Sequence, residues 1–380
     1  MKRRAKGFRV PGAAQHAAQR SGALQTRDLY GPWRSRISGA PLRFAARCTA
    51  SGTRGLRRRE FITFLGAAAA WPLAARAQQA SKVPRVGLLF PGTETVAPAR
   101  IAALREGLRA AGYREPDQVE LIARVTRGDP SRVGPMASEL VERNVDVLVP
   151  ISPAAVQAVR SLTSTIPIVA YDLETDPIGS GLVKSLARPG GNITGVFFDF
   201  PEFSKKWLEL MKEMLPRLAR IGVLWDPATG FTQLRAIEAV AAIMNIELEI
   251  VEVRALTELD GAMAAASRNN VDALVMLSTP LVGGSSEPLA NFTLQRRLPA
   301  VTLFPDFARS GGLMGYGPNI HNGYHQTARM VAKVLQGTKP ADLPVELPSK
   351  FELVVNLKTA KTIGVELPTS VLLRADEVIE

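Results

Sequence analysis

Short apolar runs alternate with amphipathic stretches from Val83 to the end of the chain. Runs of Val, Ile and Leu of this length are typical of buried parallel strands. We expect strands at residues 83–90, 119–125, 145–151, 166–171, 221–225, 248–253, 273–277, 300–304 and 351–356. Helical periodicity separates them, at residues 97–111, 131–143, 153–162, 203–215, 231–244, 257–268, 287–295 and 324–335. The alternation predicts α/β architecture, with two doubly wound parallel sheets covered by helices on both faces.

The two series of strands divide the chain into two lobes. A turn cluster, Arg-Pro-Gly-Gly-Asn at residues 188–192, precedes the junction between the series. The last helix is followed by a Pro-rich tail, which we expect to cross back between the lobes. The first lobe is predicted to comprise residues 83–198 with about 318–342. The second is predicted to comprise residues 199–317 with about 343–380.

Ligands of open parallel sheets bind beyond the carboxyl ends of the strands, so two facing lobes would form a cleft there. The strand ends carry hydroxyl, carboxylate and aromatic side chains. This mix suits a small organic solute with a polar head, with or without a flat apolar body. The candidate ligand-binding residues are Phe90, Thr93, Ser152, Ala154, Asp172, Asp176, Asp226, Ser278, Thr279, Phe304, Asp306 and Tyr316.

Several of these residues have a structural alternative. Asp176 either contacts a ligand amine or caps a helix over residues 179–186. Asp226 and Asp306 adjoin prolines, where turn chemistry alone explains an Asp. The aromatic side chains at strand ends are often core residues. Ser152 and Ser278 can donate to a ligand carboxylate together with helix N-terminal amides.

No catalytic, cofactor or metal site is expected. The sequence holds no evident nucleophile–base pair, Gly-x-Ser-x-Gly or phosphate-binding loop, so we do not expect an enzyme. His321 and His325 lie four residues apart, on one face of the last predicted helix. A metal site needs a further ligand, and no Glu at a matching spacing is evident. We therefore interpret the pair as a solvated helix face.

Residues 56–77 have the features of an export signal. A basic segment containing Arg58 and Arg59 precedes an apolar run that begins at Phe61, and Ala75 and Ala77 form a small-x-small cleavage pattern. The arginines with Phe61 resemble a twin-arginine motif, and the ordinary Sec route stays open. We expect cleavage after about Ala77 and a periplasmic product. Residues 1–55 are expected to be an unstructured leader upstream of the true start, or alternatively an organelle transit peptide.

The basic excess of the chain lies entirely in this leader. Of the 47 Lys and Arg, 16 lie in residues 1–80 beside only two acidic residues, which leaves a net charge of −2 for residues 81–380. The folded part therefore gives no argument for nucleic-acid binding. The only cysteine, Cys48, also lies in the leader. Disulfides and thiolate metal sites are thus excluded from the part that follows.

Residues 176–196, which read DPIGSGLVKSLARPGGNITGV, together with 311–317, 339–345 and 350–360, resemble the ABC-transporter substrate-binding family that includes tryptophan and tyrosine binders. The resemblance implies a type I periplasmic-binding-protein fold, with three hinge crossings and two lobes that close on a solute. It further implies a monomer that delivers the solute to a membrane permease. The strand-end segments 152–155, 226–227 and 278–281 depart from the family pattern, which leaves the ligand open.

A ligand sensor of the same fold is the alternative function. Such a sensor would be either a periplasmic partner protein or a transcription regulator. A regulator needs an N-terminal helix-turn-helix, and residues 1–55 show no such pattern.

Overall fold

The computed structural model describes residues 82–198, 200–267 and 271–380. The leader and the export signal, including Arg58, Arg59, Phe61, Ala75 and Ala77, lie outside the described residues. The expectations for them stay predictions. In the part of the chain that is described, no helix has both the length and the apolar character needed to cross a bilayer.

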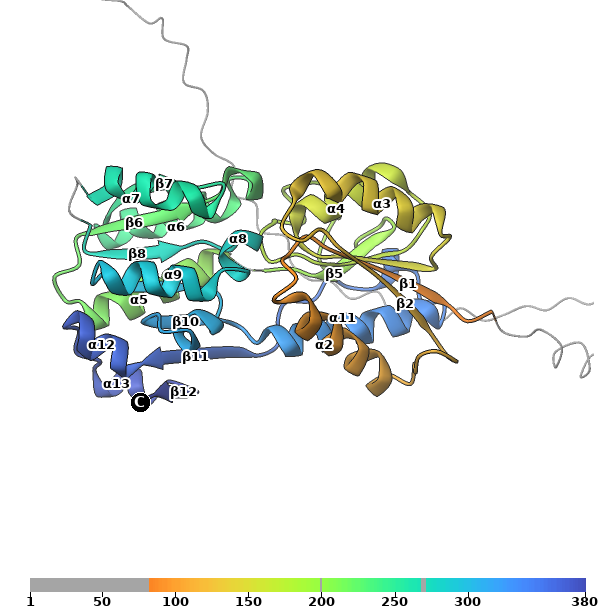
Figure 1. Cartoon of the computed structure of the whole chain (residues 1–380). Helices are drawn as coiled ribbons and strands as arrows, with labels where there is room; N and C mark the ends of the chain where they lie inside the picture. The colour runs from red at the N-terminus through yellow and green to blue at the C-terminus, as the bar shows by residue number, and fades with distance from the viewer. Residues whose placement is uncertain (1–81, 199, 268–270) are drawn as a thin grey trace, which may run out of the picture. The chain divides into compact units, whose positions relative to one another are not determined.

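The first sheet has five parallel strands in the order β2-β1-β3-β4-β5. Their bounds are β1 Arg85–Phe90, β2 Glu120–Val125, β3 Val147–Pro150, β4 Ile168–Tyr171 and β5 Ile193–Val196. The helices that follow these strands are α2 (Ala97–Ala110), α3 (Val133–Glu142, after the 3-10 turn η1, Pro130–Arg132) and α4 (Ser152–Leu162). A fourth helix, α11 (Ile320–Leu335), comes from far along the chain and packs beside α2, while α3 and α4 cover the opposite face (Figure 1).

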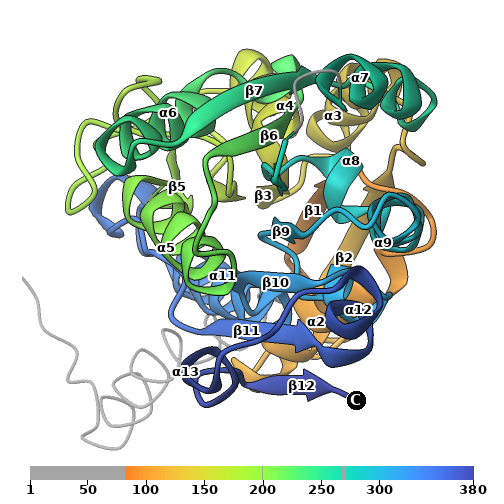
Figure 2. The ribbon, with the colours of Figure 1, turned by 90° about the vertical axis from the view of Figure 1, so that its left-hand side faces the viewer.

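The second sheet has seven strands in the order β12-β11-β10-β9-β8-β6-β7, and only β10 and β11 pair antiparallel. Its strands are β6 Arg220–Trp225, β7 Glu247–Glu252, β8 Ala273–Met276, β9 Ala300–Thr302, β10 Met314–Pro318, β11 Phe351–Asn356 and β12 Glu377–Ile379. Helices α5 (Phe200–Met214) and α6 (Thr232–Met244) lie on one face, and α7 (Leu259–Ser267), α9 (Ser286–Gln295) and α12 (Leu357–Ile363) on the other (Figure 2). The remaining short elements are η2 (Pro227–Thr229), η3 (Leu256–Glu258), α8 (Pro280–Gly283), α10 (Asp306–Arg309), η4 (Pro340–Asp342) and α13 (Thr369–Leu372).

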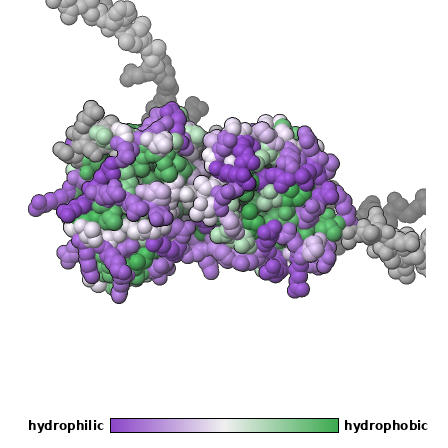
Figure 3. Space-filling view, in the orientation of Figure 1, coloured by the Kyte–Doolittle hydropathy of each residue, from purple (hydrophilic) through white to green (hydrophobic). Residues whose placement is uncertain are grey.

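The burial of each strand follows its position in the sheet. All four residues of β3 and all four of β8 are buried, as expected for central strands with helices on both faces. The outer strand β7, which reads ELEIVE, is largely accessible and has three charged residues. Every strand and every long helix expected from the sequence is present, with ends shifted by a few residues. The visible face is mostly hydrophilic, with smaller hydrophobic patches over both sheets (Figure 3).

Strand β10 was not expected from the sequence, because Gly315, Gly317 and Pro318 weaken the strand signal. The glycines are required by close packing. A Cβ on Gly317 would lie 1.8 Å from the carbonyl oxygen of Leu303, and one on Gly315 would lie 2.5 Å from Cα of Pro305. Strands β5 and β12 were also not expected.

The helix over residues 179–186 that was one alternative explanation of Asp176 is absent, because that segment forms turns. Gly181 has a φ of +67°, which interrupts a helix. The carboxylate of Asp176 instead accepts a hydrogen bond from the amide of Ile178 at 3.0 Å, which closes a local turn.

The chain passes between the two sheets three times. It leaves the first sheet between β5 and α5, returns between β10 and α11, and leaves again between η4 and β11. At the last crossing the amide of Val345 donates to the carbonyl of Leu186, and the amide of Phe197 donates to that of Glu346. The tail therefore crosses between the lobes, as its sequence predicted.

Alanine at Gly195 in β5 is expected to lower the free energy of unfolding by about 2 kcal/mol or more. Gly195 has a φ of +148°, and a Cβ there would lie 2.1 Å from the carbonyl oxygen of Ala170 in the neighbouring strand. Urea denaturation measures the effect.

Gly134 in α3 is the matched control. A Cβ on Gly134 would meet no atom within 4 Å, so alanine there is expected to stabilise the helix by roughly 0.5–1 kcal/mol. Equal stabilities for the two alanine variants would contradict the packing described for β5.

Candidate functional site

The carboxyl ends of both sheets meet at the points where strand order reverses. In the first sheet the reversal lies between β1 and β3, and in the second it lies between β6 and β8. Such switch points leave a crevice between the loops that follow the two strands. Phe90 ends β1 and Ser152 begins the helix that follows β3, while Asp226 follows β6 and Thr279 follows β8.

Two adjacent cavities occupy this crevice, and together we call them the cleft. The smaller has a volume of about 70 Å³ and the larger about 350 Å³, and both are bordered by Pro91, Gly92, Ser152 and Pro280. The aromatic and charged residues that line the smaller cavity are Phe90, Arg100, Tyr171, Glu174, Phe304 and Tyr324. The larger has no aromatic residue among the described residues of its lining, which include Thr93, Ala154, Asp226, Thr229 and Arg254.

Glu174 is a buried acid at the smaller cavity and joins the two lobes. The hydroxyl of Ser278, which follows β8, donates to Oε1 of Glu174 at 2.6 Å. Asp172 lies directly behind, where its Oδ1 accepts from the amides of Glu174 and Thr175 at 2.9 and 3.0 Å. Burial, with the nearby charge of Asp172, raises the pKa of Glu174 to about 8. Burial also raises the pKa of Asp172.

A buried tyrosine pair lines the smaller cavity together with Glu174 and Arg100. The rings of Tyr171 and Tyr324 are 5.2 Å apart and inclined by 47°. Burial is the main cause that raises the pKa of each phenol; the charge of Arg100 lowers both and that of Glu174 raises both. The two charges therefore act on the same rings from the cavity wall. Arg100 also contacts Oδ2 of Asp306 at 3.3 Å and is largely buried.

Three hydroxyl groups at the cleft are buried without a hydrogen-bond partner among the described residues. They are Oγ of Ser152, Oγ1 of Thr93 and the phenol oxygen of Tyr171. Ser152 also has a φ of +75°, which is strained for a residue with a side chain. Buried polar atoms are normally paired, so these three mark places where a solute or water completes the hydrogen bonding.

The structure brings most of the sequence-predicted residues together. Seven line the cleft: Phe90, Thr93, Ser152, Ala154, Asp226, Thr279 and Phe304. Asp172 and Ser278 are buried behind Glu174, and Asp306 contacts Arg100.

Two of the predicted residues lie elsewhere. Tyr316 stacks on Phe203, with ring centroids 5.0 Å apart, and borders a separate cavity. Asp176 is exposed and borders another cavity with Pro177. Their role in ligand binding stays a prediction.

Sequence reasoning missed Arg100, Tyr171, Glu174 and Tyr324, which all line the smaller cavity. Arg100 and Tyr324 lie within helices, where only tertiary packing decides which face meets the cleft. Glu174 follows its strand by three residues, in a segment with three acids at Asp172, Glu174 and Asp176. That acid density after a buried strand was the one available signal.

A protein-family model described as "ABC transporter substrate binding protein" matches residues 97–379. A tyrosine-binding protein of Clostridioides difficile is 25% identical over 263 residues, which cover 69% of this chain and 75% of that protein. The family resemblance inferred from the sequence motifs is therefore confirmed.

Two solved structures cover 78% of this chain and all of their own. One is a domain from Streptococcus pneumoniae in complex with L-Trp, with 28% identity and a TM-score of 0.72. The other is a conserved domain protein from Vibrio cholerae, with 30% identity and a TM-score of 0.73. More distant solute-binding proteins share the fold alone. The predicted type I periplasmic-binding-protein fold is confirmed.

Proposed function

The chain belongs to the ABC transporter substrate binding protein family, and we propose that it binds a free amino acid with an apolar or aromatic side chain in the cleft. The observation that carries this proposal is the smaller cavity. It places an acid, Glu174, and a cation, Arg100, around a buried pair of tyrosine rings. A zwitterion with an apolar body complements that arrangement.

Each part of an amino acid has a partner in the cleft. The ammonium group is placed at Glu174, whose Oε1 already accepts from Ser278. The carboxylate is placed at Arg100 and at the N-terminus of α4, where the hydroxyl of Ser152 has no other partner. Phe90 and Phe304 then pack against the side chain. The larger cavity, about 350 Å³, has the size of ordinary ligand sites and accommodates side chains that extend beyond the smaller one.

The named relatives support the same class of ligand. One is called a tyrosine-binding protein, and another was solved with L-Trp. The departures from the family pattern at Ser152, Asp226 and Thr279 all border the cleft. We therefore propose that this chain shares the amino-acid head-group site and differs from those relatives in side-chain preference.

Binding is proposed to shift the lobes toward a closed form, and the closed form to dock on an ABC permease. Three crossings between the sheets would allow the lobes to move about a hinge. In this account the protein is an extracytoplasmic monomer, exported by the Tat or Sec route, that binds its solute without catalysis.

A thermal-shift screen of the twenty amino acids tests the proposed ligand class, on protein unfolded and refolded to remove bound solute. A ligand at 100 times its dissociation constant stabilises the folded state by about 2.7 kcal/mol, which raises the Tm by roughly 5 °C. We expect this rise with apolar or aromatic amino acids and no rise with the matching decarboxylated amines. A folded protein that responds to no amino acid would contradict the proposal.

A further inference from the structure

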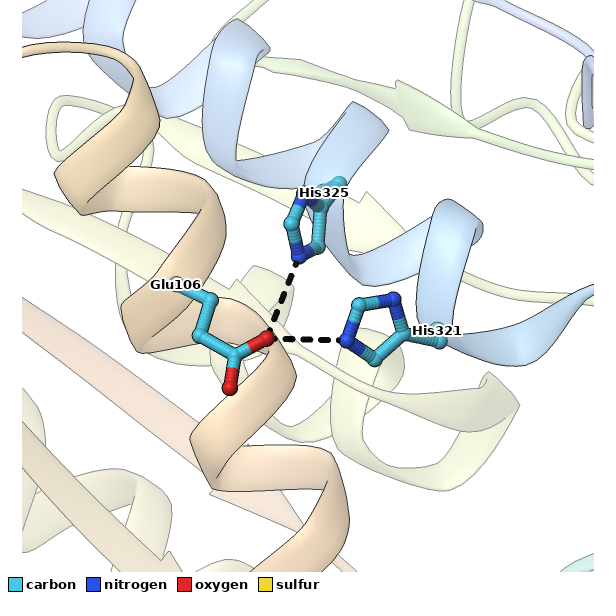
Figure 4. Close-up of side chains that lie close together, drawn as sticks. All are labelled: Glu106, His321 and His325. Atoms are coloured by element: carbon cyan, nitrogen blue, oxygen red, sulfur yellow. Dashed lines mark hydrogen bonds and ion pairs between the residues drawn. The ribbon is translucent and has the colours of Figure 1, made fainter.

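We propose that Glu106, His321 and His325 form a binding site for a divalent transition-metal ion, best suited to Zn²⁺. The three side chains meet at the contact between α2 and α11, with Glu106 and His321 exposed and His325 partly buried, and they are distinct from the residues that line the cleft. Figure 4 shows the carboxylate of Glu106 directed toward both imidazole rings. The site goes beyond the proposed solute binding and does not depend on it.

The spacing of the donor atoms fits a tetrahedral ion. Nε2 of His321 lies 2.9 Å from Oε2 of Glu106, and Nε2 of His325 lies 3.7 Å from the same oxygen. Zn²⁺ binds nitrogen and carboxylate oxygen at roughly 2.0–2.2 Å, so tetrahedral donors lie about 3.3 Å apart. The two observed distances bracket that value. All three donor atoms lie within 4.8 Å of one another, so adjustment of the side chains could bring them around one ion.

Helix packing supplies the ligand that the sequence spacing lacked. The two histidines lie on one face of α11, and Glu106 comes from α2, 215 residues before His321. Gly107 makes this possible, because a Cβ there would lie 2.6 Å from Cβ of Ala328 and 2.9 Å from Cα of His325. The helices approach closely at this glycine, which brings the adjacent Glu106 to the histidines. The interpretation of the pair as a merely solvated face is thus corrected.

The arrangement leaves Nε2 of His325 without a hydrogen-bond partner in the described part of the chain. The contact between Glu106 and His321 is a normal hydrogen bond at 2.9 Å, but His325 is too distant from the same oxygen for one. Nε2 of His325 is buried and has no hydrogen-bond partner among the described residues. A bound ion would satisfy this nitrogen, whereas the ion pair alone leaves it unmet.

The donor set also selects the class of ion. Two imidazoles with one carboxylate suit Zn²⁺ and its neighbours Co²⁺, Ni²⁺ and Cu²⁺, whereas Mg²⁺ and Ca²⁺ prefer oxygen ligands. Three protein ligands leave a fourth position for water. The ion would join α2 to α11, and these helices also supply Arg100 and Tyr324 to the cleft wall.

Zn²⁺ titration of the full-length, tag-free protein tests the site, with the Tm as a second readout. We expect one ion per chain, a rise in Tm of roughly 5 °C at 100 times the dissociation constant, and no rise with Mg²⁺. With Co²⁺ as the probe, visible d–d absorption of a four-coordinate ion should appear. Because neither readout involves an amino acid, failure of this site is distinguishable from failure of the proposed solute binding.

Substitution of two proposed metal ligands, with one control substitution, tests whether Zn²⁺ binds at these residues. His321→Gln and Glu106→Gln change exposed side chains, so their metal-free Tm should match that of the wild type, while Zn²⁺ affinity falls at least tenfold. His16→Gln changes the third histidine of the chain, which lies outside the described residues, and should leave affinity unchanged. The proposal is overturned if no Zn²⁺ binds, or if both ligand variants bind it as tightly as the wild type.

Discussion

Glu174→Gln is expected to raise the dissociation constant for the amino-acid ligand by roughly 30- to 1,000-fold. The change keeps the size of the side chain but removes the carboxyl group, which releases its proton and pairs with the ligand ammonium when the amino acid binds. Loss of one member of a buried, hydrogen-bonded charge pair costs about 2–4 kcal/mol of binding free energy, and each 1.4 kcal/mol is about tenfold in affinity. Isothermal titration calorimetry with the amino acid found by the thermal-shift screen measures the change.

Asp176→Asn is the matched control. Asp176 is also an acid after β4, two residues from Glu174, but it is exposed and borders a different cavity. Its replacement should change the dissociation constant less than twofold. If Asp176→Asn weakens binding and Glu174→Gln does not, the ammonium site is assigned to the wrong acid.

The wild-type free energy of unfolding is expected to fall as pH rises between about 4.5 and 8. Burial, together with Asp172, raises the pKa of Glu174 from 4.5 to about 8 in the folded protein. Between these values the folded state keeps a proton that the unfolded state releases, so the stability from this group is complete below pH 4.5. It is lost as pH rises through 8. At about 1.4 kcal/mol per pKa unit, the loss approaches roughly 5 kcal/mol.

Urea denaturation at pH 5 and pH 8.5, on the wild type and on Glu174→Gln, measures this contribution. The raised pKa values of Asp172 and Asp226 act in the same direction, so the difference between the two proteins reports Glu174 together with its interaction with Asp172. Glu139 has its pKa lowered to about 2 by Arg124 and therefore acts below this window. The variant should lose less stability than the wild type between the two pH values. An equal loss in both would contradict a protonated Glu174 in the folded state.

The sequence predicted the sheets well because the strands are buried on both faces. Burial on both faces explains continuous apolar runs such as VLVP at residues 147–150 and ALVM at residues 273–276. Strand β10 was missed because its glycines are required by close packing against Leu303 and Pro305. The local sequence pattern of a strand carries no information about such tertiary contacts. The helix over residues 179–186, one of the two alternatives considered for Asp176, does not form, and Gly181 there has a φ of +67°.

The candidate site was predictable only where it follows from strand ends. Phe90, Ser152 and Thr279 were found because the rule for parallel sheets places them at the cleft. Arg100 and Tyr324 were missed because the packing of α2 and α11 decides which of their faces meets the cleft. The same packing joins Glu106 to two histidines more than two hundred residues away. Such sites depend on three-dimensional proximity, which one sequence does not contain.

A crystal structure of the protein with its best-bound amino acid tests the central claim most directly. The account predicts electron density in the cleft, with the ligand ammonium within about 3 Å of a carboxylate oxygen of Glu174. It also predicts the ligand carboxylate at Arg100 or at the N-terminus of α4, and the side chain against Phe90 and Phe304. Density outside the cleft, or a ligand whose ammonium has no contact with Glu174, would contradict it.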